Sequence, residues 1–101
     1  MDDRASRETY GVARGATGTH TGDGTVLTVT LGYRPKRVEL VNMTDNTVWT
    51  KIDGMPENTT LKDAAGTPTV DTTSAIQIVQ NGFVVSAAAN IAAKAMVWAV
   101  F

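Results

Sequence analysis

Apolar and polar residues alternate over several short runs of this chain, and a period of two is the pattern of a half-buried β-strand. In residues 25–31, Leu27, Val29 and Leu31 alternate with threonines. A strand in that register presents its leucines and valine to a core and its threonines to solvent. No part of the sequence shows a sustained helical period, so the pattern predicts an all-β fold.

Short runs of the same kind follow along the chain, separated by turn residues. We predict further strands at residues 37–40, 48–52, 75–79, 83–87 and 95–101. The pair Asn81 and Gly82 favours a tight hairpin turn between two of them. The polar stretch 55–74 predicts a long loop with short strands at 59–62 and near 69–70. Strands at this spacing indicate a single antiparallel β-sandwich, jelly-roll-like in form, or a small barrel.

The chain of 101 residues is long enough for one domain, and its first part differs in composition from the rest. Five of the nine glycines precede Thr25, together with several threonines. We therefore predict a flexible, Gly/Thr-rich N-terminal arm at residues 1–23 and a β-sandwich domain at residues 24–101. The arm is either a loose terminus or a segment that orders on a neighbouring subunit.

The charge balance and the cysteine count exclude several classes of function. Nine basic residues face ten acidic ones, which gives none of the basic surplus of a nucleic-acid-binding domain. Cysteine is absent, so disulfides, thiolate zinc sites and thiol nucleophiles are excluded. The polar N-terminal residues do not resemble a secretory signal, and no apolar run approaches the roughly 20 residues that span a bilayer. We expect a soluble protein, made in a cytoplasm, with neither nucleic acid nor membrane as a partner.

Candidate chemical groups are few. His20 is the only histidine, and a lone histidine cannot supply a zinc site, so we expect it to contact solvent. The glycine-rich stretch 15–24 lacks the Gly-Lys-Ser/Thr ending of a phosphate-binding loop. Five acidic residues fall in predicted turns or loops, where such side chains stabilise local backbone: Asp45, Asp53, Glu57, Asp63 and Asp71. The sequence therefore predicts no catalytic residue, no metal site, no cofactor and no enzyme activity.

The last predicted strand, residues 95–101, is apolar on both faces. Its odd-numbered residues are alanine, valine, alanine and phenylalanine, and its even-numbered residues are Met96, Trp98 and Val100. Such a strand is either central and buried on both sides, or it fills the core with one face and a subunit interface with the other. Left exposed, it would be prone to aggregation. We predict a subunit interface at Met96, Trp98 and Val100, with the arm contributing Arg4, Arg7 and Arg14.

Three segments resemble parts of small bacteriophage virion proteins and tail-fibre modules. The first is GYRPKRVELVN at residues 32–42, which is similar to a Gly-aromatic-x-Pro-x-x-Val segment of those proteins. The second is GFVV at residues 82–85, and the third comprises Asn90 and the closing MVWA at residues 96–99. Related sequences often carry a glycine turn before the last strand, where this chain has IAAK at residues 91–94.

This resemblance implies a phage virion structural protein without enzyme activity. The expected function is that of a capsid decoration (cement) protein, made in the host bacterial cytoplasm and located on the capsid surface of the virion. Its partners would be the major capsid protein and further copies of itself, with a homotrimer favoured and a dimer possible. The alternative function is that of a tail or tail-fibre component that contacts the host surface.

Overall fold

The computed structural model describes residues 15–101, and each regular element in that range is a β-strand. The strands are β1 (Ala16–Thr21), β2 (Leu27–Thr30), β3 (Arg37–Asn42), β4 (Thr47–Ile52), β5 (Thr60–Ala64), β6 (Thr67–Asp71), β7 (Ile76–Val79), β8 (Gly82–Val85) and β9 (Ala95–Val100). Their pairings are antiparallel throughout. The prediction of an all-β, antiparallel fold is therefore confirmed.

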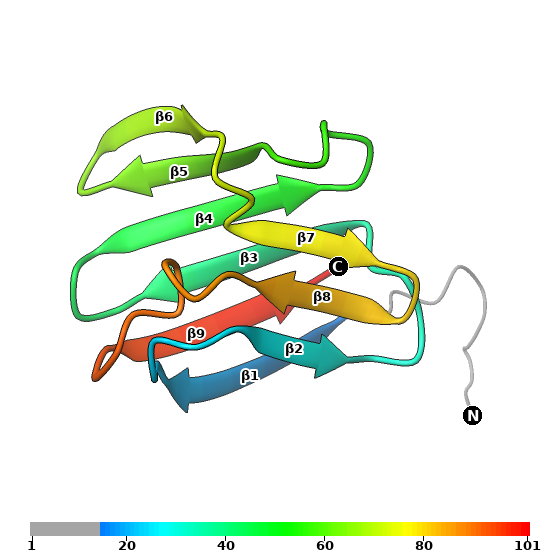
Figure 1. The fold of residues 1–101 in the computed structure, drawn as a ribbon, viewed down its shortest axis with the longest axis horizontal. Helices are drawn as coiled ribbons and strands as arrows, with labels where there is room; N and C mark the ends of the chain where they lie inside the picture. The colour runs from blue at the N-terminus through cyan, green and yellow to red at the C-terminus, as the bar shows by residue number, and fades with distance from the viewer. Residues whose placement is uncertain (1–14) are drawn as a thin grey trace, which may run out of the picture.

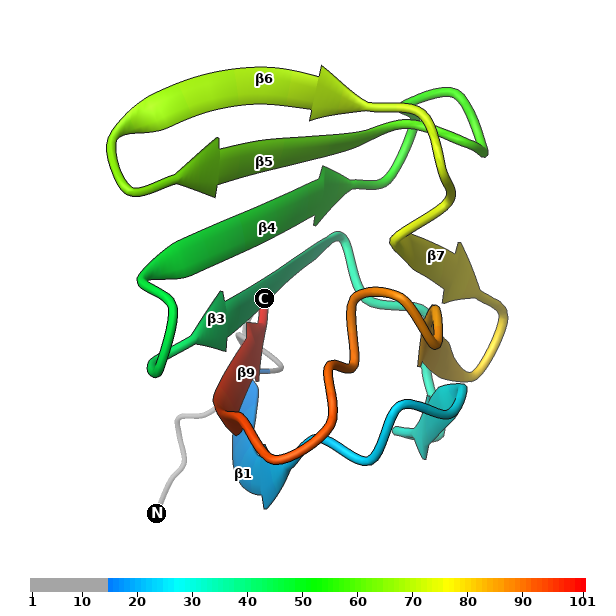
Figure 2. The same cartoon turned by 60° about the vertical axis from the view of Figure 1, so that its left-hand side comes forward.

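The strands form two sheets of unequal size. The larger has the order β1-β9-β3-β4-β5-β6 and the smaller the order β2-β8-β7. Figure 1 shows the smaller sheet lying across one face of the larger one, and Figure 2 shows β5 and β6 projecting past it. The larger sheet ends at β1 and β6 and does not close on itself, so the small-barrel alternative is wrong.

The predicted boundary of the N-terminal arm is also wrong within the described residues. Residues 16–21, assigned to the arm, form β1 and pair with β9 over their whole length. The segment has few apolar side chains, so its composition gives no strand signal, but the backbone of β9 supplies the hydrogen bonds that hold it. Residues 1–14, the remainder of the predicted arm, lie outside the described range.

The core lies between the sheets. Alternate residues of β3 and β9 point inward, and they meet the inner residues of β7 and β8. Eight large side chains retain at most 3% of their exposure: Val38, Leu40, Trp49, Ile76, Phe83, Val85, Met96 and Val100. Burial of a side chain such as Phe83 contributes about 1.5–3 kcal/mol to folding, so this cluster is the main source of stability.

Tight turns set the strand registers. The hairpin predicted from Asn81 and Gly82 is confirmed, but the two residues of its turn are Gln80 and Asn81, and Gly82 is the first residue of β8. A second hairpin, β5–β6, occupies most of the stretch predicted as a long loop. Its turn residues, Ala65 and Gly66, have φ angles of 52° and 93°. Those left-handed values match a two-residue hairpin turn, whose twist suits the flanking strands.

Candidate functional site

The predicted interface residues of β9 lie in the core of the chain. Met96 and Val100 are each 1% exposed, and Trp98 packs edge-to-face on Phe83 with ring centroids 5.3 Å apart. Met96 and Val100 are therefore not available to another subunit, whereas the interface role of Trp98, which is only partly buried, stays a prediction. Periodicity separates the two faces of a strand but does not say which face meets the core. The arginines Arg4, Arg7 and Arg14 lie outside the described residues.

The face of the six-stranded sheet that points away from the smaller sheet carries exposed apolar side chains. We call it the outer face and define it by Val41, Val48, Ile52, Leu61, Val70, Val97 and Phe101. Val97, Val41 and Val48 lie side by side on three neighbouring strands, and Leu61 lies opposite Val70 on the next two. Ile52, Leu61, Val70 and Phe101 are 45%, 43%, 60% and 56% exposed. Apolar groups gathered on one sheet face are typical of a protein contact surface.

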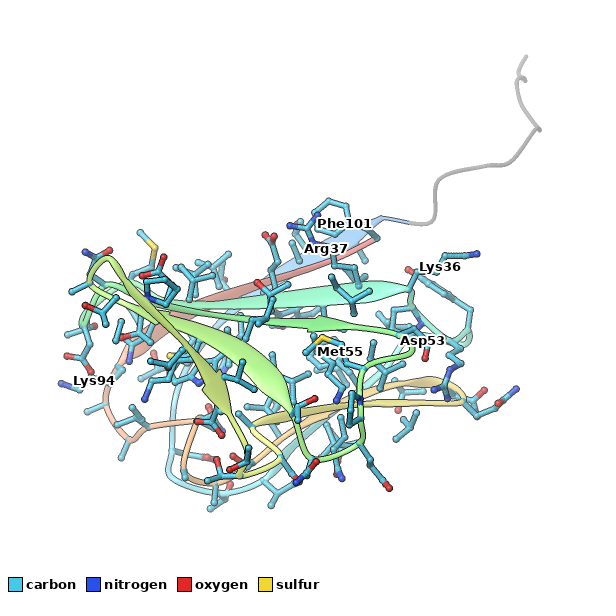
Figure 3. All side chains as sticks on the ribbon, turned by 90° about the horizontal axis from the view of Figure 1, so that it is seen from above. Lys36, Arg37, Asp53, Met55, Lys94 and Phe101 are labelled. Carbon is cyan, nitrogen blue, oxygen red and sulfur yellow. The ribbon has the colours of Figure 1, made fainter. Side chains whose placement is uncertain are left out.

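Charged groups on the outer face include one ion pair and one exposed carboxylate, that of Asp63, which lies opposite Val48 and accepts from the Gly66 N–H. The Arg37 guanidinium forms an ion pair with Glu39 and lies 5.3 Å from the centroid of the Phe101 ring. Figure 3 shows Arg37 and Phe101 together on the side of the sheet away from the smaller sheet. The Arg37 guanidinium thus contacts both an aromatic ring and a carboxylate. At this corner of the outer face a polar pair borders the apolar Phe101 ring, as polar residues border the apolar centre of a protein interface.

A cleft of about 540 Å³ opens at one end of the molecule, where the loop after β4 faces the β7–β8 hairpin. Its wall includes both charge signs, from Arg34, Lys51, Asp53 and Glu57. Arg34 donates two hydrogen bonds to the Asp53 carboxylate, Nη2 to Oδ1 at 2.8 Å and Nε to Oδ2 at 3.1 Å. This contact lowers the pKa of Asp53 and raises that of Arg34. The wall therefore carries one paired cation and anion, and its formal charges balance, which suits an uncharged polar ligand better than an ion.

Lys51 holds the loop at the mouth of the cleft. The side chain is on the inner face of β4 and the residue is only 3% exposed. Its ammonium donates to three backbone carbonyls, of Pro56 at 2.7 Å, Glu57 at 3.2 Å and Thr59 at 2.6 Å. Burial lowers the pKa of Lys51. Because all three N–H donors are used, this residue positions the loop and offers nothing further to a ligand.

His20 is half-buried and takes part in a polar cluster around Asn90, where solvent contact alone was expected. Asn90, 2% exposed, donates from Nδ2 to Asp23 Oδ1 at 3.1 Å and to the Thr25 carbonyl at 3.0 Å. Its oxygen therefore accepts from His20 Nε2 at 2.8 Å. That donation leaves Nδ1 as the bare acceptor nitrogen, buried and without a partner. The cluster joins β1 to the loops before β2 and β9, which is a structural role that no sequence pattern indicated.

Acidic side chains bond to nearby groups, but Asp63 and Asp71 do so from β5 and β6 rather than from the loops predicted for them. Asp63 accepts from the Gly66 N–H at 2.8 Å, and Asp71 accepts from the Thr73 N–H at 2.7 Å. Asp45 accepts from the side chain of Asn42 at 3.1 Å. Within residues 15–101, no three His, Cys, Asp or Glu side chains gather in the way a metal site requires.

Comparison with known proteins returns nothing: no family model, curated protein or solved structure matches this chain. Among the described residues, no helix has the length and apolar character needed to cross a membrane. The outer face and the cleft are thus the two surfaces from which a function can be argued.

Proposed function

We propose that this chain is a bacteriophage virion structural protein, a capsid decoration protein that acts by protein contact and without enzyme chemistry. The observation that carries the proposal is the outer face, with four large apolar side chains from 43% to 60% exposed on one sheet. The resemblance of residues 32–42, 82–85 and 96–99 to virion proteins supports the same function. We take the two facing sheets as a β-sandwich, the fold expected from that resemblance.

In this proposal the outer face lies on the major capsid protein. Most of the face is apolar, and its Arg37 and Glu39 side chains are already paired with each other, so the charge that contact would mainly desolvate is the Asp63 carboxylate opposite Val48. A subunit that binds where capsomers meet is bound only by an assembled shell. It therefore stabilises the shell by mass action, in proportion to the logarithm of its free concentration over its dissociation constant.

The alternative is a tail or tail-fibre component that contacts the host surface, and the cleft is the observation that favours it. A volume of about 540 Å³ is within the range of small-molecule sites. Gln77 and Gln80 line it beside the Arg34 and Asp53 pair, and amide side chains both donate and accept hydrogen bonds. A polar surface group of the host could fill such a cleft.

Electron microscopy of virions labelled with an antibody to this protein separates the two functions. The phage to use is the one whose genome encodes the chain. We expect label over the surface of the head, at many positions on each particle. Label confined to tail tips, with bare heads, would replace the decoration function by the alternative. Absence of label on purified virions would remove both.

A further inference from the structure

The six-stranded sheet has two edges, β1 and β6, and they differ in what they present to a further strand. An edge strand leaves every second N–H and C=O unpaired, which makes it a template for another strand unless it is protected. The hydrogen bonds between inner strands decide which residues of each edge point outward.

The β6 edge is blocked by a proline. The Ala65 N–H donates to the Asn46 carbonyl at 3.0 Å, so odd-numbered residues of β5 face β4 and even-numbered ones face β6. The register then directs the odd-numbered residues of β6 toward β5 and leaves Pro68 and Val70 facing outward. Proline has no N–H, so this edge lacks a donor at the centre of its free side.

The β1 edge is open. The Phe101 N–H donates to the Arg37 carbonyl at 2.9 Å, so odd-numbered residues of β9 face β3 and even-numbered ones face β1. The Gly22 N–H, which donates to the Lys94 carbonyl at 2.9 Å, agrees with this pattern. The partners of β9 in β1 are therefore the even-numbered residues. The backbone N–H and C=O groups of Thr17, Thr19 and Thr21 point away from the sheet.

None of the usual protection is present on this edge. The strand ATGTHT contains no proline and no acidic or basic residue other than His20, whose ring is bonded to Asn90. Thr17, Thr19 and Thr21 are exposed, and their side chains lie on the outer-face side of the sheet. Within the described part of the chain, no strand pairs with the free side of β1.

We propose that β1 pairs antiparallel with β1 of a second copy of this chain about a two-fold axis. The pairing joins two six-stranded sheets into one continuous sheet. When the two-fold axis passes beside Thr19, Thr19 lies opposite the partner's Thr19. Thr17 then lies opposite the partner's Thr21. Each of these pairs exchanges two backbone hydrogen bonds, which uses every free group of the three threonines.

The side chains favour a second copy over an unrelated strand. A two-fold contact brings each side chain close to the same residue, or its neighbours, in the second copy. A charged edge strand would therefore repel its copy. This edge brings threonine to threonine, a favourable cross-strand pair. Of the two oligomers left open by the sequence, this contact selects the dimer. The dimer rests on the proposed function only in the requirement that copies of the chain associate. Binding to capsid shells is measured in a separate experiment, so the dimer and the decoration function can fail independently.

Thr19→Pro and Thr19→Val test the pairing as a matched pair. The Thr19 N–H points away from β9, so proline removes no hydrogen bond within the chain, while valine keeps the N–H and changes only the side chain. Sedimentation of the full chain over a concentration series should show a monomer–dimer equilibrium for wild type and for Thr19→Val. Thr19→Pro should raise the dimer dissociation constant at least about tenfold, because two hydrogen bonds are lost per dimer. A sedimentation profile identical to that of Thr19→Val would overturn the proposal.

Amide hydrogen exchange of the wild-type chain gives a second measurement that needs no variant to fold. Amides of Gly18 and His20, bonded to β9, should exchange slowly at all concentrations. Amides of Thr17, Thr19 and Thr21 should become slow only at concentrations where the dimer forms. If these three exchange fast in the dimer, copies associate elsewhere and the proposal is wrong. Wild type could instead be monomeric, with the amides of Thr17, Thr19 and Thr21 becoming slow only when capsid shells are added. In that case β1 pairs with a strand of the shell, and the proposed self-pairing is wrong while the decoration function stands.

Discussion

The backbone of Gly18 lies directly against the indole ring of Trp98. A Cβ atom at position 18 would lie 2.4 Å from Cε2 and from Cζ2 of the ring, well inside contact distance. Trp98 also packs edge-to-face on Phe83, so a shift of its ring away from position 18 would disturb that contact. The missing side chain of Gly18 is therefore what lets β1 lie beside β9 over a tryptophan.

We expect Gly18→Ala to destabilise the protein by about 1–3 kcal/mol, the usual cost of an extra methyl group in a packed site. Chemical denaturation measured by tryptophan fluorescence checks this. Gly15→Ala is the matched control, because a Cβ there meets only the Val100 carbonyl at an ordinary 3.6 Å. Equal stability of the two variants would contradict the packing described for Trp98.

Removing the Lys51 ammonium should loosen the loop at the mouth of the cleft. Lys51→Met keeps the length and apolar stem of the side chain but removes the ammonium donor from the carbonyls of Pro56, Glu57 and Thr59, of which the Pro56 carbonyl still accepts from Thr59. We expect a loss of about 1–3 kcal/mol of stability, the cost of buried unsatisfied groups. Thermal unfolding measures it, with Lys36→Met as a control at an exposed lysine. A loss no larger than that of the control would show that water replaces the ammonium without cost.

The Arg34 and Asp53 pair predicts a pH dependence whose sign is fixed. The pair holds the pKa of Asp53 below the ordinary 3.8 in the folded chain. Its contribution to stability is therefore present above pH 3.8 and disappears as the pH falls through the lowered value. We expect Arg34→Gln to return the pKa of Asp53 toward 3.8, measured by NMR titration of the carboxylate. The stability difference between wild type and variant should be greatest near neutral pH and vanish in acid.

Charge on the outer face should abolish shell binding without unfolding the chain. Leu61 and Val70 face each other on β5 and β6 and are both largely exposed, so Leu61→Lys with Val70→Lys costs little folding energy. Cosedimentation with capsid shells should then show binding weakened at least about tenfold, because the lysines would be desolvated in the contact. Val26→Lys, at a site 60% exposed and off this face, should bind as wild type does. Unchanged binding by the double variant would move the contact away from the outer face.

Deleting the N-terminal segment should be harmful once the deletion reaches β1. Removal of residues 1–21 takes away a whole strand, uncovers the β9 edge and removes His20 from the cluster around Asn90. We expect that chain to unfold at a clearly lower temperature than one lacking only residues 1–14, which keeps β1. A comparison of the two truncated chains by calorimetry isolates the strand. Equal transition temperatures would show that β1 adds nothing to stability.

Much of the fold follows from local pattern in the sequence. The alternation of Val38 and Leu40 with charged residues predicted β3, and the pair Asn81 and Gly82 predicted the β7–β8 hairpin. The strand β1 could not be predicted, because Thr17, Gly18 and Thr19 carry no apolar alternation and the strand depends on a partner about 80 positions away in the chain. The inner face of β9 was misassigned because both of its faces are apolar.

The site was less predictable than the fold. The outer face gathers Leu61, Val70 and Phe101 from separate strands, and only the register brings them together. Lys51 and Asn90 act through backbone carbonyls or a histidine ring whose position depends on the folded loops. The spacing of residues along the sequence therefore does not predict the contacts of Lys51 and Asn90.

The place of β9 in the sheet has a consequence for how the chain is made. It lies between β1 and β3, so among the strands of residues 15–101 the first one pairs with the last one. During synthesis at roughly 5–20 residues per second, residues 16–21 wait for several seconds, unpaired, until residues 95–100 leave the ribosome. Throughout that interval the nascent chain carries an unfilled gap beside β3, which a chaperone or a neighbouring nascent copy can occupy.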